Sequence, residues 1–333
     1  TSGASNTAGI STPSCGNYLG IDVWFSVVVP ASGRLTVSTS TVGGSSLTDA
    51  ALALYSASAC GSTMTEVGCN DNAPAGNMPS LSMSGLTAGA TYYVRVWGAG
   101  NTAFGQFTIC ATEPPANDEP CGAISLTVGS SCTLASRTNV GATNTTGPPA
   151  PGCGSFTGSS GDVWYSFVVP SSGIAIIEST AGTLTDGSMA LYYSATCTAS
   201  SLTLVQCSGD EGLGTMPFLR FSDLVPGGTY YLRYWGTGST SGTFNLCVWS
   251  PTMPAGDCVY LLELFDSGEN GWGTSAVQVQ INGGATVNHT VAASNFYNSA
   301  VIGLYSGDLL QVSYVNSGPN QGQNRYQIRQ VPG

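Results

Sequence analysis

The side chains with the most obvious chemistry in this 333-residue chain are its eleven cysteines. No two of them form a Cys-x-x-Cys pair, and His289 is the single histidine, so their spacing does not match zinc or iron–sulfur sites. Disulfides formed in an oxidising compartment explain them better. The odd number leaves one thiol over, and we assign it to Cys258, which has no second cysteine in its segment.

Spacing also predicts how the other ten cysteines pair. Cys60 and Cys69 enclose a short segment, and Cys197 and Cys207 enclose one of nearly the same length, which suits neighbouring strands joined by a loop. We therefore predict bonds within these two pairs. Subtraction then gives the remaining bonds, which are Cys15 with Cys110, Cys153 with Cys247, and Cys121 with Cys132.

Catalytic groups are scarce. A Ser-His-Asp triad would have to use His289, which lies in a strand-like stretch, and no Gly-x-Ser-x-Gly elbow precedes a helix. Two acidic positions recur along the chain, Asp22 with Asp162 and Asp49 with Asp186, and could be read as a glycosidase pair. Because they stand at turn positions, we expect them to cap loops. The chain is predicted not to be an enzyme.

Loops rich in carboxylates and amides could hold calcium outside the cell. The best of them carries Asp266, Glu269 and Asn270, and the segments 70–72 and 210–211 offer similar groups. None completes a spacing signature such as that of the EF-hand loop. Calcium is therefore the ion to test, and no other cofactor is expected.

A contact surface is predicted on one face of a recurring strand. The segment TYYVRVW at 91–97 returns as TYYLRYW at 229–235, and alternate residues of a strand point to opposite sides. An arginine between outward aromatic rings could bind a sugar or a protein, or could form a cation–π ladder under a covering strand, and we favour the ladder. The outward residues are Tyr93, Arg95 and Trp97, then Tyr231, Arg233 and Trp235, with Trp249 and Trp272 as separate candidates for an exposed contact.

These residues recur because one module occurs twice. DVWFSVVVP at 22–30 returns as DVWYSFVVP at 162–170, and GQFTIC at 105–110 returns as GTFNLC at 242–247. The segments are short, β-branched and aromatic, and none of ten or more residues shows a helical period. We predict an all-β chain of three tandem β-sandwich, jelly-roll-like domains at 1–112, 113–250 and 251–333, the first two being an internal repeat.

The first copy lacks an opening strand. Residues 121–137 precede the second copy and contain a strand signal at Ile124, Leu126 and Val128, whereas the first copy begins at Thr1. The missing part either lies upstream in a precursor or is replaced by a strand of another subunit. We predict the second arrangement.

The two copies share the motif D-V-W-[FY]-S-x-V-V-P and a later G-x-T-Y-Y-[LV]-R-x-W. With these motifs, residues 1–250 resemble the tandem repeats of secreted Bacteroidota surface proteins, which are similar to the bacterial pre-peptidase C-terminal domain. Residues 258–273 resemble a module that opens with D-S-x-G-D-G-W, although Glu269-Asn270 replaces the usual Gly-Asp. The resemblance implies jelly-roll-like sandwiches, type IX secretion, and roles in adhesion, surface filaments or substrate binding, without catalysis.

Composition limits the classes of molecule that the chain is expected to bind. Only 8% of residues are charged, the net charge is −11, and all seven basic residues are arginine, which argues against binding to nucleic acid or to an acidic membrane. No apolar run reaches the length of a membrane span. We expect an extracellular or cell-surface structural or adhesive protein that self-associates into a homopolymer such as a filament. The alternative is a set of carbohydrate-binding or targeting modules of a larger secreted enzyme, with a polysaccharide as ligand.

Overall fold

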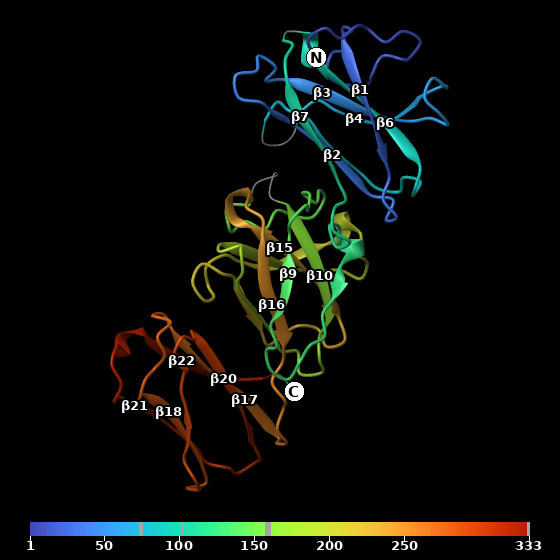
Figure 1. The fold of residues 1–333 in the computed structure, drawn as a ribbon. Helices are drawn as coiled ribbons and strands as arrows, with labels where there is room; N and C mark the ends of the chain where they lie inside the picture. Colours follow the sequence, from blue (N-terminus) through green and yellow to red (C-terminus); the bar gives the residue numbers. More distant parts are fainter. Residues whose placement is uncertain (73–75, 102, 157–160, 332–333) are drawn as a thin grey trace. The chain divides into compact units, whose positions relative to one another are not determined.

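The computed structural model describes residues 1–72, 76–101, 103–156 and 161–331. Within these ranges the chain forms strands and single turns of 3-10 helix, and it forms no α-helix (Figure 1). None of the helical turns described has the length or apolar character needed to cross a membrane. The chain divides into two compact units, one of residues 1–118 with 141–144, the other of residues 119–140, 145–156 and 161–331.

Strands β1 to β7 form the first sandwich, which we call repeat one. Its strands are β1 (Asp22–Val28), β2 (Leu35–Thr41), β3 (Ala50–Ser56), β4 (Thr65–Asn70), β5 (Ser80–Met83), β6 (Thr91–Gly98) and β7 (Phe107–Thr112). They make two sheets with the orders β1-β6-β3-β4 and β5-β2-β7. Tyr92, Val94 and Val96 of β6 lie in the core between the sheets, on the face that the alternation predicts.

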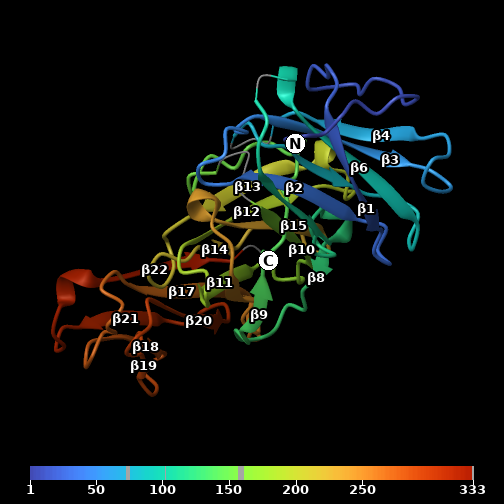
Figure 2. The ribbon, with the colours of Figure 1, turned by 45° about the horizontal axis from the view of Figure 1, so that its top comes forward.

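Strands β8 to β16 form repeat two (Figure 2). Its strands are β8 (Ile124–Ser125), β9 (Ala135–Thr138), β10 (Asp162–Val168), β11 (Ala175–Ala181), β12 (Gly187–Tyr193), β13 (Thr203–Ser208), β14 (Phe218–Phe221), β15 (Thr229–Gly236) and β16 (Thr243–Trp249). The sheet orders are β13-β12-β15-β10-β8 and β14-β11-β16-β9. Each sheet therefore repeats an order of repeat one and adds one strand at an edge.

The two added strands belong to residues 119–139, which we call the opening segment. Strand β8 pairs in parallel with β10, and the amide of Leu126 continues this pairing by donating to the Ser166 carbonyl at 2.7 Å. The segment then crosses to the other sheet, where β9 pairs antiparallel with β16. One stretch of chain thus covers one edge of each sheet.

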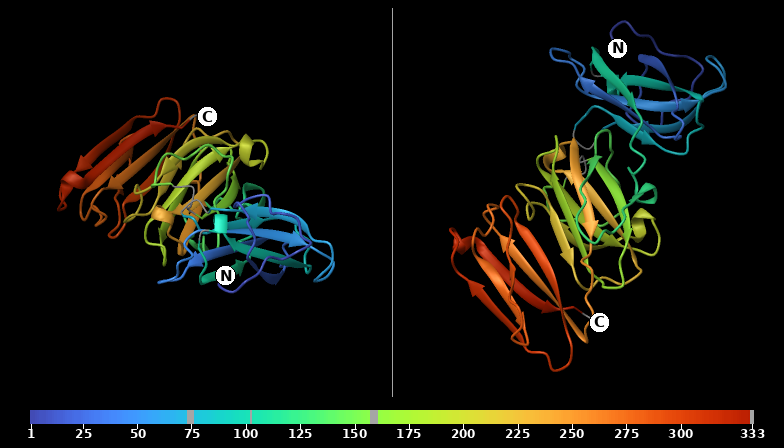
Figure 3. Two further views of the ribbon diagram at one scale, coloured as in Figure 1. Left: turned by 90° about the horizontal axis from the view of Figure 1, so that it is seen from above. Right: turned by 60° about the horizontal axis from the view of Figure 1, so that its bottom comes forward.

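Strands β17 to β22 form the C-terminal module, drawn in orange and red in Figure 3. They are β17 (Cys258–Asp266), β18 (Ala276–Ile281), β19 (Val287–His289), β20 (Tyr297–Leu304), β21 (Leu310–Val315) and β22 (Asn324–Gln330). The sheet orders are β20-β17-β22 and β19-β18-β21. Leu262, Leu264 and Val277 lie between the two sheets with Trp272. The prediction of tandem all-β sandwiches is confirmed.

Both faces of β17 are buried. Leu262 and Leu264 face the core of the C-terminal module, while Leu261 packs in one cluster with Ile176 and Phe218 of repeat two. Glu263 is fully buried and lies 2.6 Å from the Arg220 guanidinium of repeat two and 3.0 Å from that of Arg329, and Gln327 donates to it at 2.7 Å. Repeat two and the C-terminal module therefore form one compact unit.

Candidate functional site

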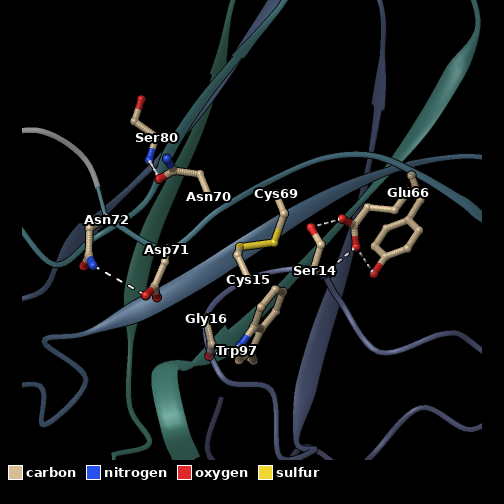
Figure 4. The surroundings of a disulfide bond; sticks show 11 residues. Ser14, Cys15, Gly16, Glu66, Cys69, Asn70, Asp71, Asn72, Ser80 and Trp97 are labelled. Carbon is tan, nitrogen blue, oxygen red and sulfur yellow. Dashed lines mark hydrogen bonds between the residues drawn. A yellow bond between two sulfur atoms is a disulfide. The ribbon is translucent and has the colours of Figure 1, made fainter.

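The disulfides differ from every predicted pairing. The bonds are Cys15–Cys69, Cys153–Cys207, Cys121–Cys197 and Cys132–Cys247. Residues 1–21 fold over the outer face of the β1-β6-β3-β4 sheet, and this brings Cys15 to Cys69 on β4, as Figure 4 shows. Cys60 lies in the β3–β4 turn and stays exposed. Short spacing along the chain was misleading because the disulfide partner comes from the covering layer. The predicted bonds that fail are Cys60 with Cys69, Cys197 with Cys207, Cys15 with Cys110, Cys153 with Cys247, and Cys121 with Cys132.

The remaining bonds attach the opening segment. Cys121 lies near its start and bonds to Cys197, and Cys132 lies between β8 and β9 and bonds to Cys247. The described residues of repeat one contain no cysteines that correspond to Cys121 and Cys132. Cys60 and Cys110, which correspond to Cys197 and Cys247, are free and exposed. Cys258 is also free, as predicted.

The predicted contact surface on β6 is wrong, because its central residues are buried. Arg95 and Trp97 are fully inaccessible beneath residues 1–21, which we call the covering segment of repeat one. Arg95 forms an ion pair with Asp22 and stands 4.1 Å over the Tyr18 ring. The interpretation that we favoured, a cation–π ladder under covering chain, agrees with these contacts. The covering chain is an irregular segment and not a strand.

The same network recurs in repeat two beneath its own covering segment, residues 145–156. Arg233 pairs with Asp162 and lies 4.3 Å over the Phe156 ring, and both charged side chains are buried. Thr145 fixes the carboxylate by donating its hydroxyl at 2.8 Å and its amide at 3.0 Å. Trp164 donates to the same hydroxyl at 2.8 Å.

A buried ion pair of this kind is structural. Every charged group in it has a partner, so the desolvation cost of burying the charges is offset. The glycines beside the disulfides let the covering segments approach closely, because a side chain at Gly16 would collide with Ala51 and one at Gly154 with Ser188. Trp97 also donates to the carbonyl of Gly16 at 3.0 Å. Asp22 and Asp162 thus anchor covering segments.

A polar cleft lies between repeat two and the C-terminal module. It has a volume of about 470 Å³, and Phe265 and Phe296 supply aromatic surface to its wall. Arg325 is exposed beside it, with the guanidinium 4.7 Å from the centre of the Phe265 ring. Four carboxylates line it, those of Asp210, Glu211, Asp266 and Glu269, together with the polar residues Ser267, Gln323 and Asn324. Sequence reasoning had marked two of these acidic loops separately, but nothing in their spacing showed that they meet.

The profile of a family described as galactose binding domain-like, and associated with type IX secretion, matches residues 2–109 and again residues 116–248. These ranges cover most of the chain and coincide with repeat one and repeat two. The chain belongs to this family. A comparison with curated proteins finds no match.

Galactose binding domain-like modules form a family of binding domains and not of catalytic ones. The association with type IX secretion fits an extracellular or surface protein, as do the four disulfides. The expected kinship with secreted surface repeats is therefore confirmed at this level. His289 lies on β19 of the C-terminal module, outside the matched residues, and burial lowers the pKa of its imidazole.

Two further tryptophans were expected to be exposed, but one is buried and the other is only partly exposed. Trp272 is fully buried in the C-terminal module and donates to the Phe265 carbonyl at 3.0 Å. Trp249, on the second galactose binding domain-like module, packs with the cluster around Phe218 and donates to Glu178 at 2.6 Å. Of the predicted contact residues, Tyr93, Tyr231 and Trp249 keep partial exposure.

The three residues expected to bind calcium form hydrogen bonds with three different parts of the structure. The Asp266 carboxylate accepts the amides of Gly268 and Gly271 at 3.0 and 2.6 Å, which makes it the anchor of its own loop. Glu269 accepts from the Gly214 amide at 2.8 Å, and Asn270 donates to Gln323 at 3.0 Å. N–H groups directed at a carboxylate stabilise its negative charge and occupy the oxygen lone pairs that a bound cation would need.

A different pair of carboxylates suits a hard cation better. Asp49 and Asp71 each bury an Oδ1 atom that has no hydrogen-bond partner among the described residues, and Figure 4 shows Asp71 beside Asn72. Burial and the neighbouring charge of Asp71 raise the pKa of Asp49. The sequence had indicated segment 70–72 but not its approach to Asp49, which is distant in the chain.

Proposed function

We propose that this chain is a secreted, non-catalytic binding protein and that its ligand is a neutral polysaccharide held in the cleft between repeat two and the C-terminal module. The observation that carries the proposal is the combination of aromatic wall and polar rim in that cleft. Ligand sites in proteins pair apolar surface with a few polar groups that fix orientation.

The chemistry of the rim favours a sugar. Carboxylates accept hydrogen bonds from sugar hydroxyls, and side-chain amides both donate and accept them. The ring faces of Phe265 and Phe296 suit the C–H side of a pyranose. Four acidic residues face one arginine, Arg325, so an anionic polysaccharide would be repelled. A neutral or amino sugar fits this charge.

Binding to immobilised polysaccharides tests the proposal. Asp210 and Arg325 are exposed, so Asp210→Asn and Arg325→Ala should leave the fold intact while each weakens binding by about tenfold, the effect of one lost charged hydrogen bond. Asp223→Asn is the matched control, because Asp223 is an exposed acid of repeat two outside the cleft lining. Equal binding by all three variants would exclude the cleft, and no binding to any neutral polysaccharide would exclude the function.

A second candidate is a structural or adhesive subunit of a surface filament in Bacteroidota. The observation in its favour is the pair of uncovered edges in repeat one, since exposed strand edges invite pairing with another chain. A surface with few charges also eases close contact between subunits. Negative-stain microscopy of concentrated full-length protein distinguishes the two, because a filament subunit should form fibres and a polysaccharide-binding protein should remain as separate particles.

A further inference from the structure

Cys60 and Cys110 stand where repeat two is joined to its opening segment. The internal repeat matches Cys60 to Cys197 and Cys110 to Cys247. In repeat two these positions bond to Cys121 and Cys132 of the opening segment, whereas in repeat one both thiols are free and exposed. Repeat one therefore has one cysteine of each of the two disulfides that attach the opening segment in repeat two.

Among the described residues, two strands of repeat one also lack the neighbour that their counterparts in repeat two have. Strand β1 is an edge where β10 is paired with β8, and β7 is an edge where β16 is paired with β9. Phe25 of β1 is 37% exposed, and its counterpart Tyr165 is 1% exposed because the opening segment covers it. Unpaired amides and an exposed aromatic ring are what an added strand would satisfy.

The path of such a strand is marked at its far end. The amide of Asn139, the last residue of the opening segment, donates to the Gly242 carbonyl at 3.2 Å. In repeat one the amine of Thr1 donates to Gly105, the counterpart of Gly242, at 2.5 Å. The Thr1 amine therefore lies at the place on repeat one where the last residue of the opening segment lies on repeat two.

We propose that repeat one accepts a strand-forming polypeptide segment with two cysteines eleven positions apart, and that this segment pairs with β1 and β7 and forms disulfides to Cys60 and Cys110. A second copy of this chain is a poor donor, because its opening segment is already bonded at Cys121 and Cys132 and its removal would expose Tyr165. The inference goes beyond polysaccharide binding and does not depend on it.

The two bonds need an oxidant. Each forms from two thiols, which together lose two protons and two electrons to a small-molecule disulfide such as oxidised glutathione. Two molecules of glutathione disulfide are consumed and four of reduced glutathione are released. An oxidising exterior supplies such a couple.

The probe is a synthetic peptide with the sequence of residues 119–138 of this chain, mixed with the full-length protein in a glutathione buffer. We expect one peptide per protein, with its first cysteine bonded to Cys60 and its second to Cys110 by peptide mapping. The melting midpoint of the unit that contains repeat one should rise by on the order of 10 °C, as two added disulfides imply.

Matched variants separate strand pairing from simple thiol reactivity. Cys60→Ser and Cys110→Ser should each leave one bond, and Cys258→Ser should leave both. A peptide with aspartate in place of the residue that corresponds to Leu126, and a scrambled peptide with both cysteines in place, should react far less. The proposal is overturned if the scrambled peptide reacts equally, if the peptide bonds to Cys258 instead, or if Cys60 and Cys110 bond only to a second copy of the protein.

Discussion

Repeat one and repeat two each have a core, a covered outer face and a buried ion pair, but only repeat two has an added strand at one edge of each sheet. The Cys15–Cys69 bond of one matches the Cys153–Cys207 bond of the other, and Arg95–Asp22 matches Arg233–Asp162. The difference lies in residues 119–139. Attachment of the covering segment is therefore intrinsic to the sandwich, whereas closure of the edges is a separate addition.

The largest effect should come from the shared feature. Arg95→Met and Arg233→Met each leave a buried carboxylate without its partner, and each should cost about 3–5 kcal/mol of unfolding free energy. Calorimetry on the full chain would follow the transition of each unit. Addition of Asp22→Asn or Asp162→Asn to the matching variant should recover part of the loss. A large loss in one repeat alone would show that the two networks are not equivalent.

The next test uses one position in two environments. Tyr165→Ala removes a ring that is 1% exposed and should cost about 3–4 kcal/mol, because it leaves a cavity under the opening segment. Phe25→Ala removes a ring that is 37% exposed and should cost about 1 kcal/mol. Urea titration of both variants gives the comparison. Equal losses would mean that the edge of repeat one is already covered.

The disulfides give a third contrast. Cys132→Ser should lower the unfolding free energy of repeat two by about 2–4 kcal/mol, since the bond to Cys247 closes a long loop. Cys110→Ser should change that of repeat one by less than about 0.5 kcal/mol, because this thiol is free and exposed. Thermal melting without reductant measures both. A marked loss from Cys110→Ser would reveal a partner for that thiol.

The smallest effect concerns pH. Burial raises the pKa of Glu178, whose counterpart in repeat one is the uncharged Ser38. A raised pKa in the folded state means that the group adds stability below its ordinary value near 4.5, and that this is lost as pH rises through the folded value. The melting temperature of the wild type should therefore rise on acidification more than that of Glu178→Gln. Parallel profiles for the two proteins would contradict this.

Local patterns predicted the strands and their inner faces well. The alternation in TYYVRVW placed Tyr92, Val94 and Val96 correctly, because period-2 burial is a property of the strand alone. The outer face was misjudged because a segment without secondary structure covers Arg95 and Trp97, and such segments have no periodicity to recognise. The cleft escaped notice for a similar reason, since packing between modules brings Asp210 and Glu269 together.

The predicted disulfide pairings were wrong for a more instructive reason. Spacing suggested local bonds, whereas each bond joins an outer segment to a strand or a strand connection of the sandwich. The repeat itself held the missing signal: residues 1–112 contain counterparts of Cys197 and Cys247, which are Cys60 and Cys110, but none of Cys121 and Cys132. Comparison of the copies by difference, and not by similarity alone, would have pointed to Cys60 and Cys110.

The placement of the arginines has a consequence for survival outside the cell. Trypsin-like proteases cut after lysine or arginine in locally unfolded chain, and this protein has no lysine and seven arginines. Six of these arginines lie within strands, and Arg34 directly precedes β2. Hydrogen-bonded strands resist entry into a protease active site, so cleavage has to await an opening of the sheet. We therefore expect the folded protein to resist cleavage by secreted trypsin-like proteases.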